Sequence, residues 1–380
     1  RDKETIQDRV KIIEDMMPEI IAIDADPLMN TSWKDADDPW NFLAVCFEIA
    51  AFHREGYGFV SHIAVALDAT NSGLQIYSAM LRDSVGAAAT NVSPQERPAD
   101  VYKDVAEITE RKLAEDILND TEDSQFAKVW LEMGVDRTLT KKPTMCLVYS
   151  STLFSCRDYV RDTLNERIQS GKLINPFGKD EDAFIKGVFY LAKVIWSSIG
   201  ECVVSAQTCM DWMQKIARDV SKLQIPIMWQ TPSGFKVVQQ YPEYKTLRIQ
   251  THIDGHMMRP RLSSPDYQKV DKKRAASGLC PNFIHSLDSS FLILTVLRCQ
   301  KENPNLSGYW MIHDSFSTTA KHSATLARCL REEYVRMFTE FDVVNDFRLE
   351  MLKCIPEVAL PPSRGSLDLK GVIESKYFFS

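Results

Sequence analysis

Several signals of particular protein classes are missing from this sequence. Its nine cysteines are scattered with no C-x-x-C pair, which argues against a structural zinc site and for a reducing compartment. We see no uninterrupted apolar run of the ~18 residues that a membrane span needs, and no basic, acid-poor targeting segment near the start. There is also no internal repeat and no low-complexity tract. These absences favour an ordinary globular protein that makes no contact with a membrane.

An excess of positive charge is missing as well. The formal net charge is -7, with 45 Lys and Arg against 52 Asp and Glu. Proteins that bind nucleic acid usually present a basic surface. If this chain binds DNA or RNA, its positive charge must therefore be local, or another chain must supply it.

The length and the hydrophobic pattern predict a mainly helical α+β protein. At 380 residues and 44% hydrophobic composition, the chain can bury a large core and divide into two or three lobes. Helical periodicity predicts helices over 6–17 (ending near Pro18 or continuing to Asp26), 41–52, 97–121, 184–222, 282–300 and 322–341. Residues 68–83 are expected to pass from a tight turn into a helix, and residues 125–149 to lead into a helix that contains 137–149. Strands are predicted over 59–67, 246–253 and 309–312, with a hairpin turn at Asp254-Gly255 and an apolar tail that docks at 377–380. Cys202 and Cys209, seven residues apart, are expected to pack in the core.

The most informative stretch is the segment RTLTKKPTMCLVY, residues 137–149. Arg137, Lys141, Met145 and Tyr149 recur every fourth residue, so on a helix they share one face. Two cations suit a polyphosphate, and a thioether and a phenol suit the flat face of a base. Pro143 predicts a kink or a true helix start near Lys141. Spacing alone also fits an amphipathic surface helix with solvated cations.

Two aspartates follow apolar strands directly. Asp68 comes after IAVAL, and Asp314 comes after WMIH. Neighbouring carboxylates presented at strand ends can hold a pair of divalent ions for phosphoryl transfer. An isolated aspartate at such a position more often makes a turn, and Asp68 could equally cap the helix that follows it.

Three segments together form a more specific pattern than any one of them. In chain order they read DATNSGLQIYSAMLRD, RTLTKKPTMCLVYSS and GLCPNFIHSLDSSF followed by WMIHDSF. This order resembles the single-subunit, bacteriophage-type DNA-dependent RNA polymerases over nearly the whole chain. The resemblance implies a right-hand polymerase fold with a small antiparallel palm sheet and a helical fingers domain. It places the palm at 1–96 and 286–380, and the fingers at 97–285 with a hairpin at 245–261.

The resemblance also implies roles for the charged residues. Asp68 and Asp314 match the palm aspartates that bind two Mg²⁺ ions. Arg137 and Lys141 match the cations that grip the triphosphate, and Lys141 is also a candidate general acid for the pyrophosphate. Lys142 stands where the family has an Arg or Lys, so it is expected to bind the nucleotide too.

The base and sugar of the incoming nucleotide have their own matches. Met145 and Tyr149 match the base pocket, with Tyr149 as the residue that selects ribose, and His285 matches the histidine that contacts the minor groove of the new base pair. Gly73 stands where family A DNA polymerases carry a Glu that blocks the 2′-hydroxyl. Those enzymes also have the sequence H-D-E in the turn that contains the second aspartate, whereas this chain has H-D-S. Both differences favour an RNA polymerase over a DNA polymerase. A catalytically inactive scaffold with the same fold is a third alternative, against which the intact metal and phosphate positions argue.

One residue departs from the family pattern, and one region matches a specificity element. Ser150 replaces the Gly that usually follows the Tyr. The hairpin at 245–261 lies where the family has its promoter-reading hairpin, and Arg248 and Gln250 on its polar face can read base edges.

The family's D-x-x-G-R motif and N-terminal domain are not in these residues. The simplest interpretation is a heterodimeric polymerase in which a second subunit supplies both; the alternative is a single longer polypeptide. The implied partners are a DNA template, the RNA product and NTPs, and the implied location is the cytoplasm of an infected bacterial host.

Overall fold

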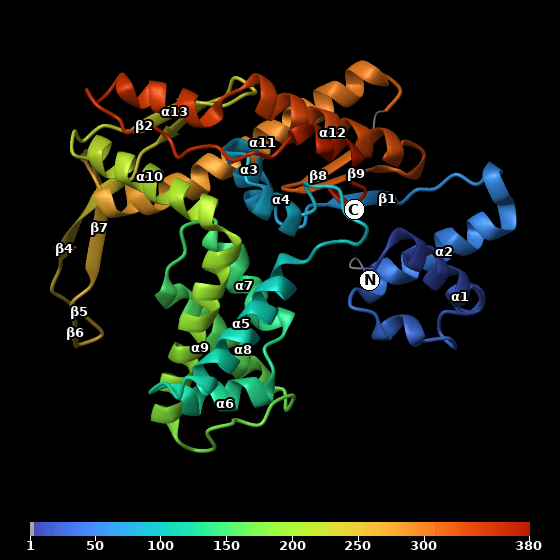
Figure 1. Ribbon diagram of the computed structural model, residues 1–380, viewed down its shortest axis with the longest axis horizontal. Helices are drawn as coiled ribbons and strands as arrows, with labels where there is room; N and C mark the ends of the chain where they lie inside the picture. The colour runs from blue at the N-terminus through green and yellow to red at the C-terminus, as the bar shows by residue number, and fades with distance from the viewer. Residues whose placement is uncertain (1–3, 307) are drawn as a thin grey trace.

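The computed structural model describes residues 4–306 and 308–380 of the chain. Helices form most of its regular structure, and the strands form one three-stranded and three two-stranded antiparallel sheets. Figure 1 shows an upper body around the three-stranded sheet, a helical bundle below it, a separate N-terminal helical unit and a projecting hairpin arm. The predicted α+β, mainly helical fold with a small antiparallel sheet is confirmed.

The three-stranded sheet has the order β1-β9-β8, formed by β1 (Ala64–Asp68), β9 (Ser315–Thr319) and β8 (Tyr309–Ile312). Asp68 pairs with Ser315, and Ile312 also pairs with Ser315, so His313 and Asp314 form the two-residue turn between β8 and β9. The β8 prediction is confirmed, whereas β1 begins five residues later than the strand predicted at 59–67. This register brings the two strand-end aspartates to one edge of the sheet.

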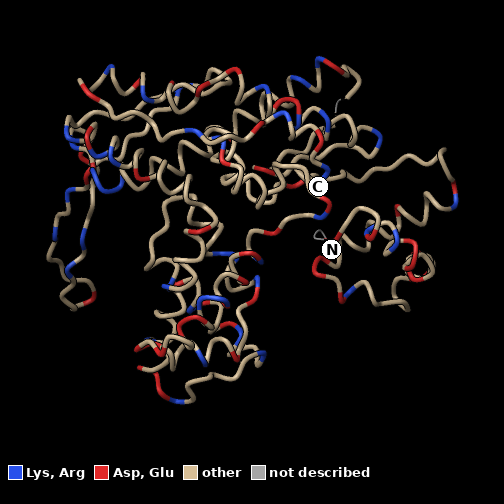
Figure 2. The backbone as a smooth tube through the Cα atoms, in the orientation of Figure 1, with Lys and Arg blue, Asp and Glu red and all other residues tan. Residues whose placement is uncertain are grey.

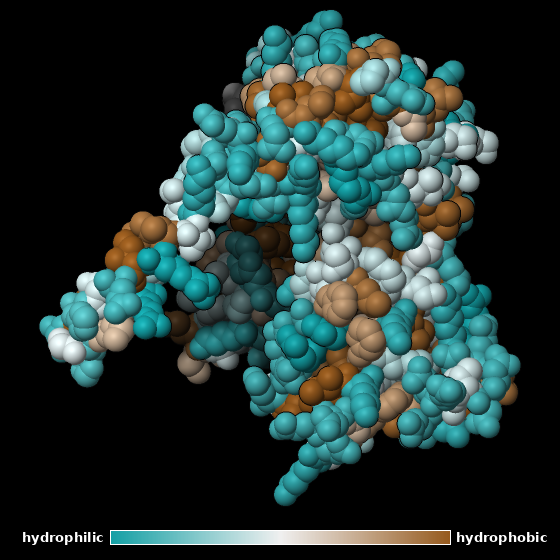
Figure 3. All heavy atoms as spheres, turned by 90° about the vertical axis from the view of Figure 1, so that its left-hand side faces the viewer, coloured by the Kyte–Doolittle hydropathy of each residue, from teal (hydrophilic) through white to brown (hydrophobic). Residues whose placement is uncertain are grey.

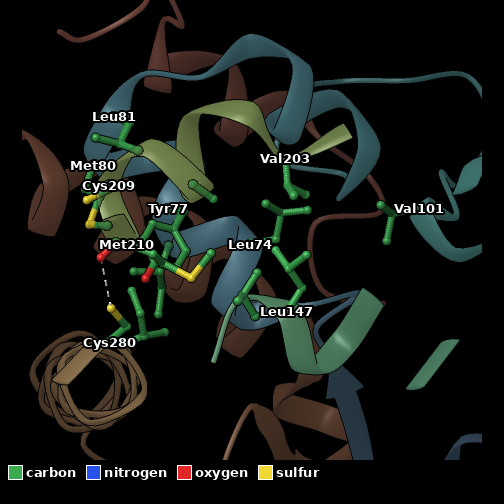
Figure 4. Packing of buried hydrophobic residues seen from close by; sticks show 14 of the residues in the cluster. Leu74, Tyr77, Met80, Leu81, Val101, Leu147, Val203, Cys209, Met210 and Cys280 are labelled. Carbon is green, nitrogen blue, oxygen red and sulfur yellow. Dashed lines mark hydrogen bonds between the residues drawn. The ribbon is translucent and has the colours of Figure 1, made fainter. Parts of the chain in front are cut away.

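Three helices of the upper body pack against one another. They are α3 (Ser72–Leu81), whose ten residues are all buried, α10 (Val204–Ser221) and α11 (Lys272–Glu302). Figure 4 shows Tyr77 of α3 between Cys209 and Met210 of α10 and Cys280 of α11, and the Cys280 thiol donates to the Met210 carbonyl over 3.6 Å. Cys202 and Cys209 are buried in the core, as predicted.

Two predicted helical segments differ from the observed helices. The pattern at 184–222 divides into α9 (Glu181–Cys202) and α10, because Val203 leaves the helical conformation at φ -130° and ψ 33°. The helix predicted at 282–300 begins ten residues earlier, at Lys272, where the Asp271 side chain caps it by accepting from the Arg274 amide. The predicted boundary between fingers and palm at 285 therefore lies inside one continuous helix, and the division into named domains stays a prediction.

The lower bundle is formed by α5 (Val101–Leu118), α6 (Ser124–Met133), α7 (Arg137–Leu147), α8 (Leu153–Gln169) and α9 (Figure 1). Its core contains the fully buried Trp130, whose indole N–H donates to the Gly187 carbonyl at 2.8 Å. The prediction that α7 starts near Lys141 is wrong. The helix begins at Arg137, because Asp136 caps it by accepting from the Leu139 amide, and it contains Pro143.

The N-terminal unit contains α1 (Ile6–Ala25) and α2 (Pro39–Glu55), with the short 3-10 helices Ser32–Asp35 and Gly56–Gly58. It has its own small core around Ile20, Ile23 and Trp33. The α1 helix passes through Pro18, as one of the two predicted alternatives required. Within α2, Cys46 and Ala50 are buried, whereas Phe52 is 48% exposed.

The hairpin arm is formed by β4 (Pro242–Arg248) and β7 (Arg261–Val270), and its tip by β5 (Thr251–Ile253) and β6 (His256–Met258). Asp254 and Gly255 make the predicted turn, with φ angles of 48° and 78°. Figure 1 shows that the arm extends away from the upper body. Its side chains are therefore mostly open to solvent.

The remaining elements complete the upper body. They are α4 (Ser84–Ala89), β2 (Ile227–Gln230), β3 (Lys236–Gln239), α12 (Ser323–Glu340), α13 (Val343–Leu352) and the 3-10 helices Ala320–His322 and Leu369–Glu374. The C-terminal tail docks, as predicted: Phe378 and Phe379 are buried, and the Ser380 amide donates to the Asp68 carbonyl at 3.3 Å.

Among the described residues, α9 and α11 are long and apolar enough, by length and composition alone, to cross a membrane. Charged residues interrupt both helices, among them Lys193 in α9 and Asp288 in α11, so neither contains an uninterrupted apolar run of that length. In the apolar 18-residue window of each helix, the share buried inside the fold is 50% for α9 and 44% for α11. Core helices of many globular proteins are buried in the same way. They are weak evidence for a membrane span, and the absence of membrane contact stays a prediction.

Candidate active site

A cavity of about 830 Å³ opens between the sheet edge, the start of α3, the end of α7 and the middle of α11. It is lined by Asp68, Ala69, Thr70, Asn71, Ser72, Tyr102, Arg137, Lys141, Met145, Tyr149, His285, Asp288, Ser289, Leu292, His313 and Asp314. Figure 3 shows that the face of the molecule carrying the arm is deeply hollowed. The cavity contains both strand-end aspartates, the whole Arg137–Tyr149 row and His285, which come from distant parts of the chain.

The two aspartates lie on neighbouring strand ends. Asp68 is the last residue of β1, and the Ala69 amide donates to the Asp314 carbonyl at 3.3 Å. The alternative that Asp68 caps α3 is wrong, since Asn71 is the cap and accepts from the Leu74 amide at 3.0 Å. Across the described residues, no group of three or more His, Cys, Asp and Glu side chains is placed to hold a metal ion. Any ion bound here would therefore depend on these two carboxylates and on oxygens of a substrate.

The two cations of the row differ in how firmly they are held. The Arg137 Nε donates to Asp100 Oδ2 at 2.5 Å, and its guanidinium lies 5.2 Å from the centre of the Tyr102 ring. Asp100 also caps α5, so Arg137 is fixed to the start of that helix. Lys141 lies one turn later and is exposed within the cavity lining.

Lys142 points elsewhere. Its ammonium lies 5.2 Å from the centre of the Tyr159 ring on α8, and the residue does not line the cavity. Successive residues on a helix point about 100° apart, so neighbours in sequence face different surroundings. The structure thus separates the two lysines that the motif placed together.

Tyr149 lies just beyond the end of α7, with its amide donating to the Cys146 carbonyl at 3.1 Å. Its ring centre is 4.6 Å from that of His285, at an interplanar angle of 37°. Burial raises the pKa of Tyr149 to about 12, and the nearby Asp288 carboxylate acts in the same direction. Burial lowers the pKa of His285, and His313 adds to this effect. At neutral pH this corner therefore presents a phenol and a neutral imidazole.

Several cavity residues were not singled out from the sequence, among them Ser72, Tyr102 and Asp288. Asp288 accepts from the Ser72 hydroxyl at 3.0 Å, and burial raises its pKa to about 7, against the effect of the Ser72 hydrogen bond. The Tyr102 hydroxyl donates to the Thr70 carbonyl at 3.1 Å. Asp288 was readable in principle, because it follows His285 by three residues and so shares its helix face. Tyr102 had no local signal.

Comparison with known proteins identifies the family. The sequence matches the family of DNA-dependent RNA polymerases over residues 1–359. The chain belongs to this family. Its resemblance to phage-type polymerases, read from three motifs, is confirmed.

Relatives of this chain occur in phages and in plants. It is 32% identical to T7 RNA polymerase of Escherichia phage T7 over 419 residues, which cover all of this chain and 47% of the relative. It is 31% identical to a DNA-directed RNA polymerase of Enterobacteria phage T3, with the same coverage. It is 32% identical over 387 residues to DNA-directed RNA polymerase 2, chloroplastic/mitochondrial, of Nicotiana sylvestris, covering 36% of that protein. The chain thus spans about half the length of the phage relatives.

The predicted nucleic-acid residues of the polymerase chain lie in two places. His285 lines the cavity, whereas Arg248 and Gln250 lie exposed on the hairpin arm, outside it. Figure 2 shows Lys and Arg along the strands of the arm. The arm therefore carries local positive charge despite the acidic total, and the reading of base edges by Arg248 and Gln250 stays a prediction.

The Ser150 departure from the family pattern also has a structural consequence. Ser150 has φ 65°, in the left-handed region that favours Gly. The backbone of this polymerase chain keeps the conformation that suits Gly and accepts a serine in it.

Proposed function

We propose that this chain carries the nucleotidyl-transfer centre of a phage-type DNA-directed RNA polymerase. The observation that carries the proposal is the single cavity that joins two strand-end carboxylates with the Arg137–Tyr149 row. Such a site has anionic groups for a divalent ion at one side and cations for a triphosphate at the other. The substrates would be NTPs, a DNA template and a growing RNA.

The donor set of the cavity fits divalent magnesium. Asp68 and Asp314 offer carboxylate oxygens, the ligands that Mg²⁺ prefers, and substrate phosphates commonly complete its coordination. When bound, two such ions would activate the primer 3′-hydroxyl and neutralise charge on the triphosphate. The two aspartates would hold them there.

The other cavity residues would each contact a different part of the nucleotide. Arg137, held by Asp100, and Lys141 would bind the phosphates, with Lys141 in reach to protonate the pyrophosphate leaving group. Met145 would contact the base, and Tyr149 would contact the sugar. His285, stacked beside Tyr149, would contact the minor groove of the new base pair.

The close approach of Gly73 and Tyr149 supports ribonucleotides, rather than deoxyribonucleotides, as the substrates. A side chain at that position would approach the Tyr149 hydroxyl, so a glutamate, as in family A DNA polymerases, would disturb this corner. The DNA polymerase alternative is therefore disfavoured. The scaffold alternative is disfavoured because the predicted metal and phosphate residues meet in one cavity.

The N-terminal unit offers a surface for a second subunit. It exposes large apolar side chains, among them Leu28 (82%), Met29 (80%) and Trp40 (73%). Apolar surface of this kind commonly marks a contact with another protein. We propose a heterodimer in which the second subunit carries the D-x-x-G-R motif and the N-terminal domain, in the cytoplasm of an infected bacterium.

The test is extension of an RNA primer on a DNA template by the complete polymerase that contains this chain. Asp68→Asn and Asp314→Asn should each lower nucleotide addition more than about a hundredfold, because each removes a metal ligand. Template binding should persist. Asp211→Asn, at an exposed carboxylate on α10, is the matched control and should extend the primer normally. Retention of more than about a hundredth of the activity by either site variant would refute the assignment.

A further inference from the structure

A side-chain hydrogen bond links α3 and α11 in the cavity, next to Tyr149 at the end of α7. The Ser72 hydroxyl donates to Asp288 Oδ2 at 3.0 Å, although the two residues are 216 positions apart. We propose that Asp288, acting through Ser72, is a positioning residue that orients the Tyr149 hydroxyl and thereby sets the preference for ribose over deoxyribose. The inference rests on the proposed function, in which Tyr149 contacts the sugar.

Neighbouring groups confine the Tyr149 side chain closely. A Cβ built on Gly73 would lie 3.2 Å from the Tyr149 hydroxyl oxygen and 3.3 Å from the ring carbon that bears it. On the other side, the His285 ring centre is 4.6 Å away. His285 and Asp288 are three residues apart on α11, so they face the cavity from one side of a rigid helix. The hydroxyl of Tyr149 therefore points to the start of α3, where Ser72 lies.

The directions of the pKa shifts agree with this placement of the three side chains. The Asp288 carboxylate is the second cause, after burial, of the raised pKa of Tyr149, and a hydrogen bond with Ser72 acts in the opposite direction. Asp314 also faces both Tyr149 and Asp288, and His313 faces Asp288. Ser72 thus lies between a carboxylate and a phenol: it donates to the carboxylate, and it affects the pKa of the phenol.

The arrangement assigns a direction to the hydrogen bonds. A serine hydroxyl has one proton and two lone pairs. Because its proton is donated to Asp288, Ser72 offers lone pairs to the Tyr149 O–H, which leaves the phenol oxygen free to accept. A ribose 2′-hydroxyl can then donate to Tyr149, whereas a deoxyribose leaves that acceptor unpaired. Without Asp288, the Ser72 hydroxyl can instead donate its proton to the Tyr149 oxygen. That bond then competes with the one from the ribose 2′-hydroxyl.

The experiment measures kcat/KM for a ribonucleotide and for its deoxyribonucleotide with the complete polymerase. Asp288→Ala and Ser72→Ala should each lower the ribose-to-deoxyribose ratio about tenfold, the effect of one hydrogen bond. Asp288→Asn keeps an acceptor for Ser72 and should retain most of the preference. In a Tyr149→Phe background, Asp288→Ala should lower the ratio less than about twofold further, because the group it orients is gone. Asp211→Asn is the control.

Two results would overturn the proposal. One is an Asp288→Ala variant that loses activity toward both nucleotides equally, with an unchanged ratio, as a purely structural role requires. The other is full additivity of Asp288→Ala and Tyr149→Phe.

A second measurement does not depend on catalysis and separates this proposal from the proposed function. With 3-fluorotyrosine at position 149, the ¹⁹F resonance should move in Asp288→Ala and Ser72→Ala and stay in place in Asp211→Asn. An unmoved resonance in the first two variants refutes the hydrogen-bonded chain itself. If the resonance moves but wild-type protein adds neither nucleotide, the chain of side chains exists and the assigned catalytic function is wrong.

Discussion

Replacing Gly73 with alanine tests how closely α3 and Tyr149 approach each other. The new Cβ would lie 2.9 Å from the Val148 Cγ2, 3.2 Å from the Tyr149 hydroxyl and 3.3 Å from its ring. The contact with the buried Val148 side chain requires that residue or α3 to shift, and Tyr149 must also move by a few tenths of an ångström. In the sequence, the missing side chain at Gly73 was interpreted as leaving room for a ribose. In the structure, it leaves room for the Tyr149 side chain, which is proposed to select the ribose.

Two opposing effects determine the stability of Gly73→Ala. Alanine in a helix is favoured over glycine by about 1 kcal/mol, while added volume in a packed core costs about 1–3 kcal/mol. The expected net change in the free energy of unfolding is a loss of about 0–2 kcal/mol, which a thermal melt detects. The functional effect should be larger, because a displaced hydroxyl loses its hydrogen bond, and we expect a roughly tenfold lower ribose-to-deoxyribose ratio in a competition assay.

Gly200→Ala is the matched control. Gly200 lies in α9, and the nearest atom to its added Cβ is the Gln207 Oε1 at 3.8 Å, an ordinary contact. This variant should be slightly more stable than wild type and should discriminate normally. If Gly73→Ala behaves like Gly200→Ala in both assays, the close approach inferred here is wrong.

Three further predictions concern residues of α7 and the turn after it. Tyr149→Phe should keep nucleotide addition within a few-fold and lower the preference for ribonucleotides about tenfold in the same competition assay; an unchanged preference contradicts its role. Ser150→Gly should raise the free energy of unfolding by about 1 kcal/mol, because φ 65° strains a serine, whereas Ser151→Gly should lower it; thermal melts that show the reverse order refute the strain argument. Lys141→Ala should raise the KM for NTPs at least about tenfold, whereas Lys142→Ala should change it less than about threefold, because Lys141 lines the cavity and Lys142 does not. Equal effects of the two variants in steady-state kinetics would contradict this placement.

Local patterns in the sequence were sufficient for many elements. The Asp254-Gly255 turn, the strand at 309–312 and the face shared by the Arg137–Tyr149 row follow from backbone preferences and from helical periodicity. Helix starts were less well predicted, although their signals were present. Asp136 and Asp271 cap α7 and α11, and both caps precede the starts that apolar periodicity and Pro143 indicated. Periodicity identifies the buried face of a helix, whereas the capping side chain determines where the helix begins.

The sequence by itself determined the family, and it singled out most of the charged residues that the structure brings into one cavity, because ordered motifs carry residue types at fixed spacing. Only the tertiary structure decided how those residues are used. It paired Arg137 with Asp100, turned Lys142 toward Tyr159 and brought Ser72 to Asp288. These contacts depend on how helices distant in sequence pack against one another, and no local spacing records that packing. The hydrogen bonds that orient a catalytic side chain are therefore read from the fold, while the side chain itself can be read from the sequence.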